Sequence, residues 1–310
     1  ATVVLVSSCA VTQPVYVRKP ATWPENPVPP DRLRDHVVAL SETFVPRDFA
    51  HTDNLNRTAA YIASHLREAG AEVTEQVFTA RGARYRNVIA RFGPAEGPAI
   101  VVGAHYDTAG ELPGADDNAS AVAGLIELGP LLAGMTVKHP VVLVAYPNEE
   151  PPFFRTEHMG SAVHARSLKE QTASVKLMIC LEMIGYFSDE KNSQTFPLKA
   201  LELLYPNTGN FIALVDKMGS PWAKRMKIIM RKSSPLPAHS INAPSAVPGI
   251  DFSDHLNYWA EGYPAVMVTD TSFYRNTRYH TEFDTADTLD YDKMADVVFG
   301  VARCIEQFAQ

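Results

Sequence analysis

A chain of 310 residues is long enough for one large α/β domain or two ordinary domains, and its composition, 46% hydrophobic and 20% charged, is that of a globular protein. The formal net charge of −7, with basic runs of at most two residues, argues against a nucleic-acid partner. No stretch contains the roughly 18 to 20 consecutive apolar residues that a membrane-spanning helix needs. These properties are ordinary for a globular protein.

The sequence shows no linker, repeat or low-complexity tract, so we expect one domain over residues 31–310, preceded by an N-terminal arm, residues 1–30. In this arm, Val6-Ser7-Ser8-Cys9 resembles the lipobox that ends a bacterial lipoprotein signal peptide, in which the cysteine becomes the lipidated first residue. Two interpretations stay open: a signal or lipobox remnant with a lipid anchor at Cys9, or a plain arm. The first predicts a periplasmic, membrane-anchored lipoprotein or a secreted protein.

The hydrophobic pattern predicts alternating helices and strands. A helix at 31–44 and a second one, capped at 52–54 and closing at 69–70, precede an antiparallel pair of strands at 72–79 and 85–92. The rest indicates an α/β fold with a mixed, mostly parallel central sheet covered by helices on both faces. The elements expected there are strand 99–104, helix 118–132, strand 141–146, helix 161–169, strand 175–181, helix 198–218, strand 226–230, strand 265–269 and helix 291–308, with a proline-rich flap at 233–248.

The chemistry is expected where the strands end. Strand 99–104 leads into His105-Tyr106-Asp107, and in extended backbone residues 105 and 107 share a face, so Asp107 is placed to accept the second ring N–H of His105. A histidine held in this way is a good metal ligand. Asp117 follows at the start of the next helix, close to the same strand end. Histidine combined with carboxylate suits zinc or a similar divalent ion.

The same arrangement recurs further along the chain. Strand 141–146 is followed by Glu149-Glu150, strand 175–181 ends at Glu182, and His280 lies in a loop after strand 265–269. We expect these side chains to meet at one edge of the sheet. Two histidines and three carboxylates, with one further carboxylate left free, are what two metal ions bridged by one carboxylate require.

Five motifs occur in order: Gly103-Ala104-His105-Tyr106-Asp107, Gly114-Ala115-Asp116-Asp117-Asn118-Ala119-Ser120, Asn148-Glu149-Glu150, Leu181-Glu182-Met183-Ile184-Gly185 and Tyr279-His280-Thr281. With them the sequence resembles the co-catalytic zinc aminopeptidases, which include the secreted bacterial leucyl aminopeptidases. Glutaminyl cyclases and the glutamate carboxypeptidase type are relatives of this family. The resemblance extends from about Asn54 to the C-terminus.

The resemblance implies a zinc exopeptidase fold of the phosphorylase/hydrolase-like type, peptide substrates and two zinc ions, with one ion as the alternative. The implied ligands are Asp117 as the bridge between the ions, His105 and Glu182 for one ion, and Glu150 and His280 for the other.

The same resemblance implies the roles of two further carboxylates and one backbone feature. Asp107 would orient His105. Glu149 would be the general base and acid, taking a proton from the metal-bridging water and passing it to the leaving amine. The peptide bond between Asp117 and Asn118 would be cis. The implied function is a metallo-aminopeptidase that removes N-terminal residues from peptides, with a preference for apolar ones.

Three features depart from the family pattern. Glu182 stands where the family commonly has aspartate, so either a backbone shift absorbs the extra methylene or one ion is loosened and the site becomes mononuclear. Residues 151–159 form a longer loop after Glu150 than is usual, and we expect this loop to narrow the substrate cleft. The flap at 233–248 lacks the cysteine pair that some relatives have there.

Other functions stay open on the sequence alone. A glutaminyl cyclase with one zinc would use Glu149 to shuttle a proton within the substrate. A metal-binding module on the same fold would be non-catalytic, although it would have no need of a free carboxylate. The motifs also allow carboxypeptidase or amide-deacylase specificity.

Overall fold

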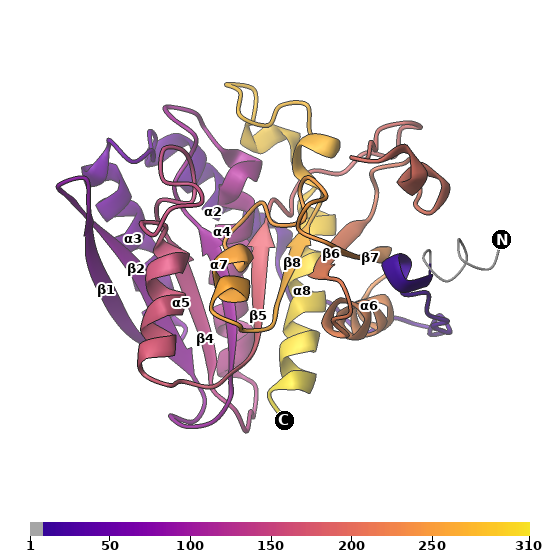
Figure 1. The fold of residues 1–310 in the computed structure, drawn as a ribbon, viewed down its shortest axis with the longest axis horizontal. Helices are drawn as coiled ribbons and strands as arrows, with labels where there is room; N and C mark the ends of the chain where they lie inside the picture. The colour runs from indigo at the N-terminus through magenta and orange to yellow at the C-terminus, as the bar shows by residue number, and fades with distance from the viewer. Residues whose placement is uncertain (1–8) are drawn as a thin grey trace.

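The computed structural model describes residues 9–310, which form one eight-stranded sheet covered by helices (Figure 1). The strands are β1 (Glu72–Ala80), β2 (Ala83–Phe92), β3 (Ala99–His105), β4 (Val141–Tyr146), β5 (Val175–Glu182), β6 (Ile212–Lys217), β7 (Ala238–Ala243) and β8 (Ala265–Thr269). Their order in the sheet is β1-β2-β4-β3-β5-β8-β6-β7. β4, β3, β5 and β8 run parallel, β6 is antiparallel to β8, and β1 and β2 add an antiparallel pair beside β4.

Helices cover both faces of the sheet. One face carries α2 (Pro30–Val38), α3 (Thr52–Glu68), α4 (Ala121–Ala133), α6 (Trp222–Ser233) and α8 (Tyr291–Phe308), and the other carries α5 (Gly160–Glu170) and α7 (His255–Ala260). The alternation of side chains along the strands produces the two cores: in β3, Ile100 and Val102 pack into the first core and Val101 into the second. The predicted mixed, mostly parallel sheet with helices on both faces is therefore confirmed.

Short helical segments connect the main elements. They are η1 (Ala39–Thr43), η2 (Ala115–Ser120), η3 (Lys199–Leu203), η4 (Ser272–Tyr274) and η5 (Ala286–Thr288). Two of them, η2 and η4, belong to the connections that carry predicted ligands, Asp117 in η2 and His280 shortly after η4.

The predicted helix 198–218 is wrong. Only the short η3 is helical there, and residues 212–217 form strand β6 between β8 and β7. Pro206 and Gly209 interrupt the helical pattern between these two elements. The apolar run that starts at Ile212 then pairs with strands on both sides, which favours extended backbone.

The predicted strand 226–230 is also wrong, because these residues lie inside α6. Met226, Ile229 and Met230 are buried at the spacing of one helix face, and α6 packs against α8. A short apolar run of this kind fits a strand and a buried helix equally well by period alone. Strand β7 and helix α7 are regular elements that the sequence pattern did not predict, and β7 takes up the middle of the expected flap 233–248.

The N-terminal arm runs over the surface and is held against α6. Lys227 Nζ donates hydrogen bonds to the carbonyl oxygens of Thr12 at 2.7 Å and Gln13 at 2.6 Å. Cys9 is exposed, but residues 6–8 of the lipobox-like motif lie outside the described residues, so the lipid anchor stays a prediction. Within residues 9–310 no helix is both long and apolar enough to cross a membrane.

Candidate metal centre

Three neighbouring parallel strands, β4, β3 and β5, bring predicted ligands to one edge of the sheet. β3 ends at His105, β5 ends at Glu182, and the chain that leaves β4 carries Glu149 and Glu150. Since parallel strands end at the same edge, residues far apart in sequence become neighbours there.

Asp117 lies between the two histidines. Its Oδ1 is 3.4 Å from His105 Nε2, and its Oδ2 is 3.1 Å from His280 Nε2. Glu182 Oε2 is also 3.4 Å from His105 Nε2, while Glu150 Oε1 is 3.1 Å from His280 Nε2. The predicted ligands thus form two groups of three residues that share Asp117, and in each group the ligand atoms lie within 4.8 Å of one another.

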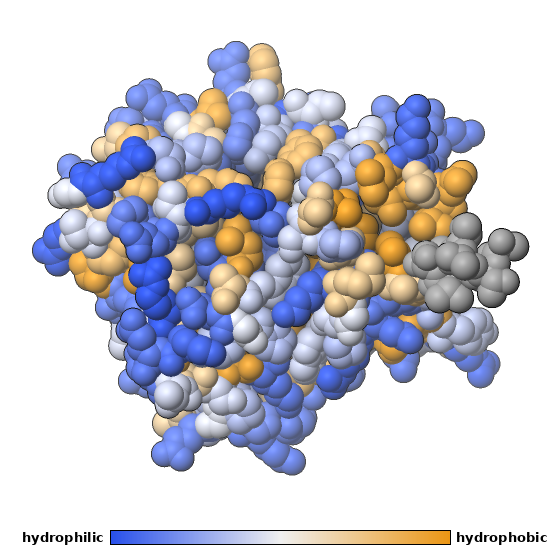
Figure 2. Space-filling model, in the orientation of Figure 1, coloured by the Kyte–Doolittle hydropathy of each residue, from blue (hydrophilic) through white to orange (hydrophobic). Residues whose placement is uncertain are grey.

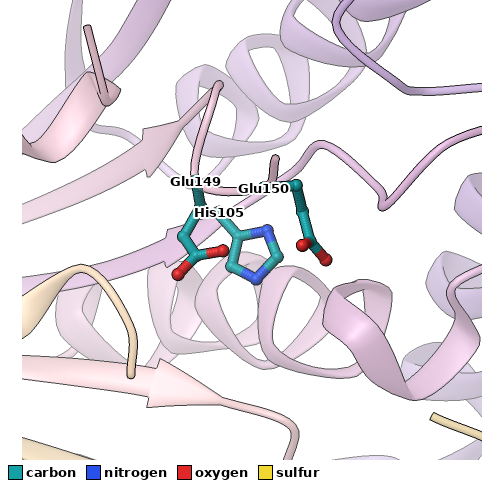
Figure 3. Close-up of side chains that lie close together, drawn as sticks. All are labelled: His105, Glu149 and Glu150. Carbon is teal, nitrogen blue, oxygen red and sulfur yellow. The ribbon is translucent and has the colours of Figure 1, made fainter. Parts of the chain in front are cut away.

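Glu149 lies beside these groups. Figure 3 shows Glu149 and Glu150 on either side of the His105 ring, and the three residues form a third group of the same size. Successive residues that leave a strand point in different directions. This explains why two adjacent glutamates take different places around one histidine.

The donor set fits divalent metal ions. His105 Nε2 and Asp117 Oδ1 are buried and have no hydrogen-bond partner among the described residues, which is costly for polar atoms unless another group compensates. Zinc bonds of about 2.0–2.2 Å in tetrahedral geometry place neighbouring ligand atoms about 3.3 Å apart. The separations of 3.1 Å and 3.4 Å around the two histidines agree with this value.

The pKa values of the site reflect crowded, buried carboxylates. Burial and the neighbouring charge of Asp117 raise the pKa of Glu150 to about 8. Burial raises the pKa of Glu149 well above its ordinary value. Burial acts in the same direction on Asp117, but the neighbouring His105 and His280 outweigh it and lower the pKa of Asp117. A divalent cation would favour the ionised form of all these carboxyl groups.

Asp107 contacts both the His105 ring and the turn after β4. His105 Nδ1 lies 3.2 Å from the Asp107 carbonyl oxygen and 3.5 Å from its Oδ1. The two carboxylate oxygens of Asp107 also accept hydrogen bonds from the backbone N–H groups of Glu149 and Glu150, both at 3.1 Å. Asp107 therefore links the end of β3 to the turn after β4, a role that the sequence did not reveal.

The loop of Asp117 is held by Asp284, which the sequence pattern did not single out. Asp284 accepts hydrogen bonds from the backbone N–H groups of Asp116 at 2.9 Å and Asp117 at 3.1 Å. The predicted cis peptide bond between Asp117 and Asn118 is present. In the sequence, Asp284 is marked only by its position four residues after His280, a candidate ligand.

Glu182 reaches His105 despite its extra methylene, and Ser253 fixes its position. Ser253 Oγ donates a hydrogen bond of 2.6 Å to Glu182 Oε2, and both side chains are buried. Ser253 lies in the segment before α7, which the sequence did not single out. A hydrogen bond of this kind orients a carboxylate toward a metal ion.

Replacing Ser253 by alanine is therefore expected to weaken the binding of one metal ion by about tenfold and to leave the other unchanged. The measurement is competition of the loaded protein with a chelator, followed for each ion. Ser174→Ala, at an exposed serine before β5, is the control. An equal loss of both ions, or of neither, would contradict the role of Ser253.

A pocket of about 230 Å³ opens beside the ligands. Its far walls come from the segment 194–211, from β6 and β7, and from β8. Apolar side chains dominate these walls: Phe196, Leu201, Phe211, Val215, Ile241 and Met267. A pocket with charged groups at one end and apolar walls beyond them suits a substrate with an apolar side chain next to a polar reacting group.

The outer surface near this pocket is also apolar. Figure 2 shows hydrophobic residues gathered at the upper right, where the segment 194–211 lies in Figure 1. Leu198, Leu203 and Leu204 of this segment are exposed. One segment thus supplies apolar side chains both to the pocket and to the surface around it.

Comparison with known proteins gives the family. The sequence model of peptidase family M28 matches residues 87–305, which is most of the chain. This chain belongs to peptidase family M28. The chain is also 50% identical over 281 residues to the uncharacterized protein YfbL of Escherichia coli (strain K12), and the match covers 88% of this chain and 86% of that protein.

Solved structures with the same fold agree with this assignment. A zinc aminopeptidase from Bacillus subtilis superimposes with a TM-score of 0.73 at 14% identity, over 92% of this chain and 96% of that one. A glutaminyl cyclase of Fimbriiglobus ruber superimposes with a TM-score of 0.69 at 20% identity, over 93% of this chain and 99% of that one. The predicted resemblance to zinc aminopeptidases and glutaminyl cyclases is confirmed, and at these identities the structural likeness shows the fold.

Proposed function

We propose that this M28 protein is a two-metal aminopeptidase that removes apolar residues from the N-terminus of peptides. The observation that carries the proposal is the position of Asp117, which directs one carboxylate oxygen toward each of two ligand groups. A site for a single ion would not need a carboxylate shared in this way.

The residues divide into two sets of ligands. His105, Asp117 and Glu182 would hold one ion, and Asp117, Glu150 and His280 the other. The zinc aminopeptidase of Bacillus subtilis, which shares this fold, supports zinc as the metal. The chemistry that two bound divalent cations supply is polarisation of the scissile carbonyl group and a lowered pKa of the attacking water.

Glu149 acts as the general base and acid. It lies beside His105 and outside the two groups that share Asp117, so its carboxylate is free to accept the proton of the attacking water. Burial raises the pKa of Glu149, and a carboxyl group with a raised pKa can both take a proton and return it to the leaving amine. Asp107, through its hydrogen bonds to the backbone of residues 149 and 150, keeps this carboxylate in place.

The pocket selects the substrate. Its apolar walls accept the side chain of the N-terminal residue, while the peptide bond lies at the end that Glu149, Glu150 and Glu182 line. Binding of this side chain orients the peptide bond toward the ligands and Glu149.

The experiment is a count of metal ions per purified chain by elemental mass spectrometry, combined with hydrolysis of leucine 4-nitroanilide. About two ions per chain and hydrolysis that stops on chelation are expected. The likeness to a glutaminyl cyclase makes cyclisation of a peptide with N-terminal glutamine the second assay. If the protein binds one ion per chain, cyclises the peptide and hydrolyses neither substrate, it is a glutaminyl cyclase and the proposal is wrong. If it binds metal but shows neither activity, a metal-binding module is favoured instead.

A further inference from the structure

Two loops from distant parts of the sheet meet beside the metal centre. The loop 151–159 follows β4, and the segment 244–254 follows β7, although β3, β5, β8 and β6 lie between these two strands. The loops touch through Phe154 and Phe252, whose ring centroids are 6.0 Å apart in an edge-to-face arrangement. Both phenyl rings line the pocket.

The ring contact continues to the loop that carries His280. Phe252 lies 6.2 Å from Phe273, and Phe273 lies 5.4 Å from Tyr279, measured between ring centroids. Tyr279 stacks on His280 at 3.7 Å. We call Phe154, Phe252, Phe273 and Tyr279 the aromatic roof, since all four line the pocket and together join three separate loops.

A charged pair fastens the first two loops together. Arg155 Nη2 lies 2.7 Å from Asp251 Oδ1, and the guanidinium carbon of Arg155 is 5.4 Å from the Phe154 ring centroid and 5.3 Å from that of Phe252. The Arg155 side chain is 48% exposed and the Asp251 side chain 15%. Arg155 therefore makes an ion pair and one cation–π contact with the segment 244–254, and a second cation–π contact with Phe154 of its own loop.

We propose that the aromatic roof and this charged pair restrict the enzyme to short peptides, such as dipeptides and tripeptides with an apolar N-terminal residue. The inference rests on the proposed aminopeptidase function. Phe154 and Phe252 both line the pocket, and the path that we infer for a longer peptide runs between them. Its passage then separates the loops and breaks the contacts of Arg155 with Asp251 and Phe252. A dipeptide fits in the pocket while the two loops stay in contact. Only the longer peptide therefore has to supply the free energy that separates the loops.

The test compares kcat/KM for Leu-Gly with kcat/KM for a hexapeptide of leucine followed by five glycines. The native enzyme is expected to prefer the dipeptide. In Arg155→Ala this preference falls by about tenfold, because the ion pair with Asp251 and the cation–π contact with Phe252 no longer hold the loops together. Asp251→Asn, which keeps the cation–π contacts, is expected to give a smaller fall in the same direction.

Arg166→Ala is the matched control. Arg166 contacts Glu157 of the same loop at 3.6 Å, but both side chains are exposed and neither lines the pocket. This variant should keep the native preference. Raising the salt concentration should lower the preference of the native enzyme and leave that of Arg155→Ala unchanged, because salt screens an exposed ion pair.

The outcomes separate the inference from the proposed function. Hydrolysis of both peptides with the same preference in the native enzyme and Arg155→Ala overturns the role of the aromatic roof and leaves the aminopeptidase standing. An equal fall in Arg166→Ala also overturns it, because the effect then belongs to the loop in general. No hydrolysis of either peptide by the metal-loaded native enzyme overturns the proposed function and this inference with it.

Discussion

Replacing Glu149 by glutamine is expected to lower kcat for leucine 4-nitroanilide by about 10²- to 10⁴-fold while the metal content stays unchanged. The amide has the size of the carboxylate but cannot accept a proton. Glu149 lies outside the two ligand groups that share Asp117, so its replacement leaves both groups complete. Steady-state kinetics and elemental analysis of the same sample measure the two quantities.

The metal count also distinguishes two roles for Glu149. In the group with His105 and Glu150 it would itself be a ligand, and the glutamine variant would then bind less metal. Glu157→Gln, an exposed glutamate in the following loop, is the control and should keep full activity and metal content. Full activity in Glu149→Gln would show that another group moves the proton.

Replacing Asp117 by alanine is expected to abolish measurable hydrolysis and to remove both metal ions. The reason is that Asp117 contributes to both ligand groups, so its loss leaves two ligands for each ion. His280→Ala removes a ligand from one group only and should retain about one ion per chain. Elemental analysis of the two variants, prepared together, makes the comparison.

Folding has to be checked in this experiment, because Asp117 is buried. Its backbone N–H keeps the hydrogen bond to Asp284 in the alanine variant, and circular dichroism should therefore show native secondary structure. Asp287→Asn, at an exposed aspartate of η5, serves as a surface control. One tightly bound ion in a folded Asp117→Ala protein would mean that the carboxylate is not shared.

The sequence predicted the candidate ligands because these residues follow regular local patterns. His105, Glu150 and Glu182 each come at or shortly after the end of an apolar, β-branched run, and such runs become neighbouring parallel strands. The carboxyl ends of neighbouring parallel strands lie at the same edge of the sheet, so these residues could be placed together from the sequence pattern. His280 has no such strand directly before it, and its place in a loop after β8 points to this edge of the sheet less directly.

The sequence pattern failed where a segment depends on partners far away in the chain. β6 is extended because it lies between β8 and β7, and residues 226–230 are helical because α6 packs against α8. Neither partner can be identified from the local period of hydrophobic residues. Tertiary packing therefore set the conformation of both segments and overrode the preference of the local pattern.

The α/β class, the strands that carry the candidate ligands and the residues that could hold a metal ion follow from local patterns in the sequence. Three contacts became visible in the folded chain: Asp284 holds the backbone of Asp117, Ser253 donates a hydrogen bond to Glu182, and the loops after β4 and β7 meet. Apolar periodicity is encoded within a few residues, whereas these contacts join residues that come together only when the whole sheet has formed.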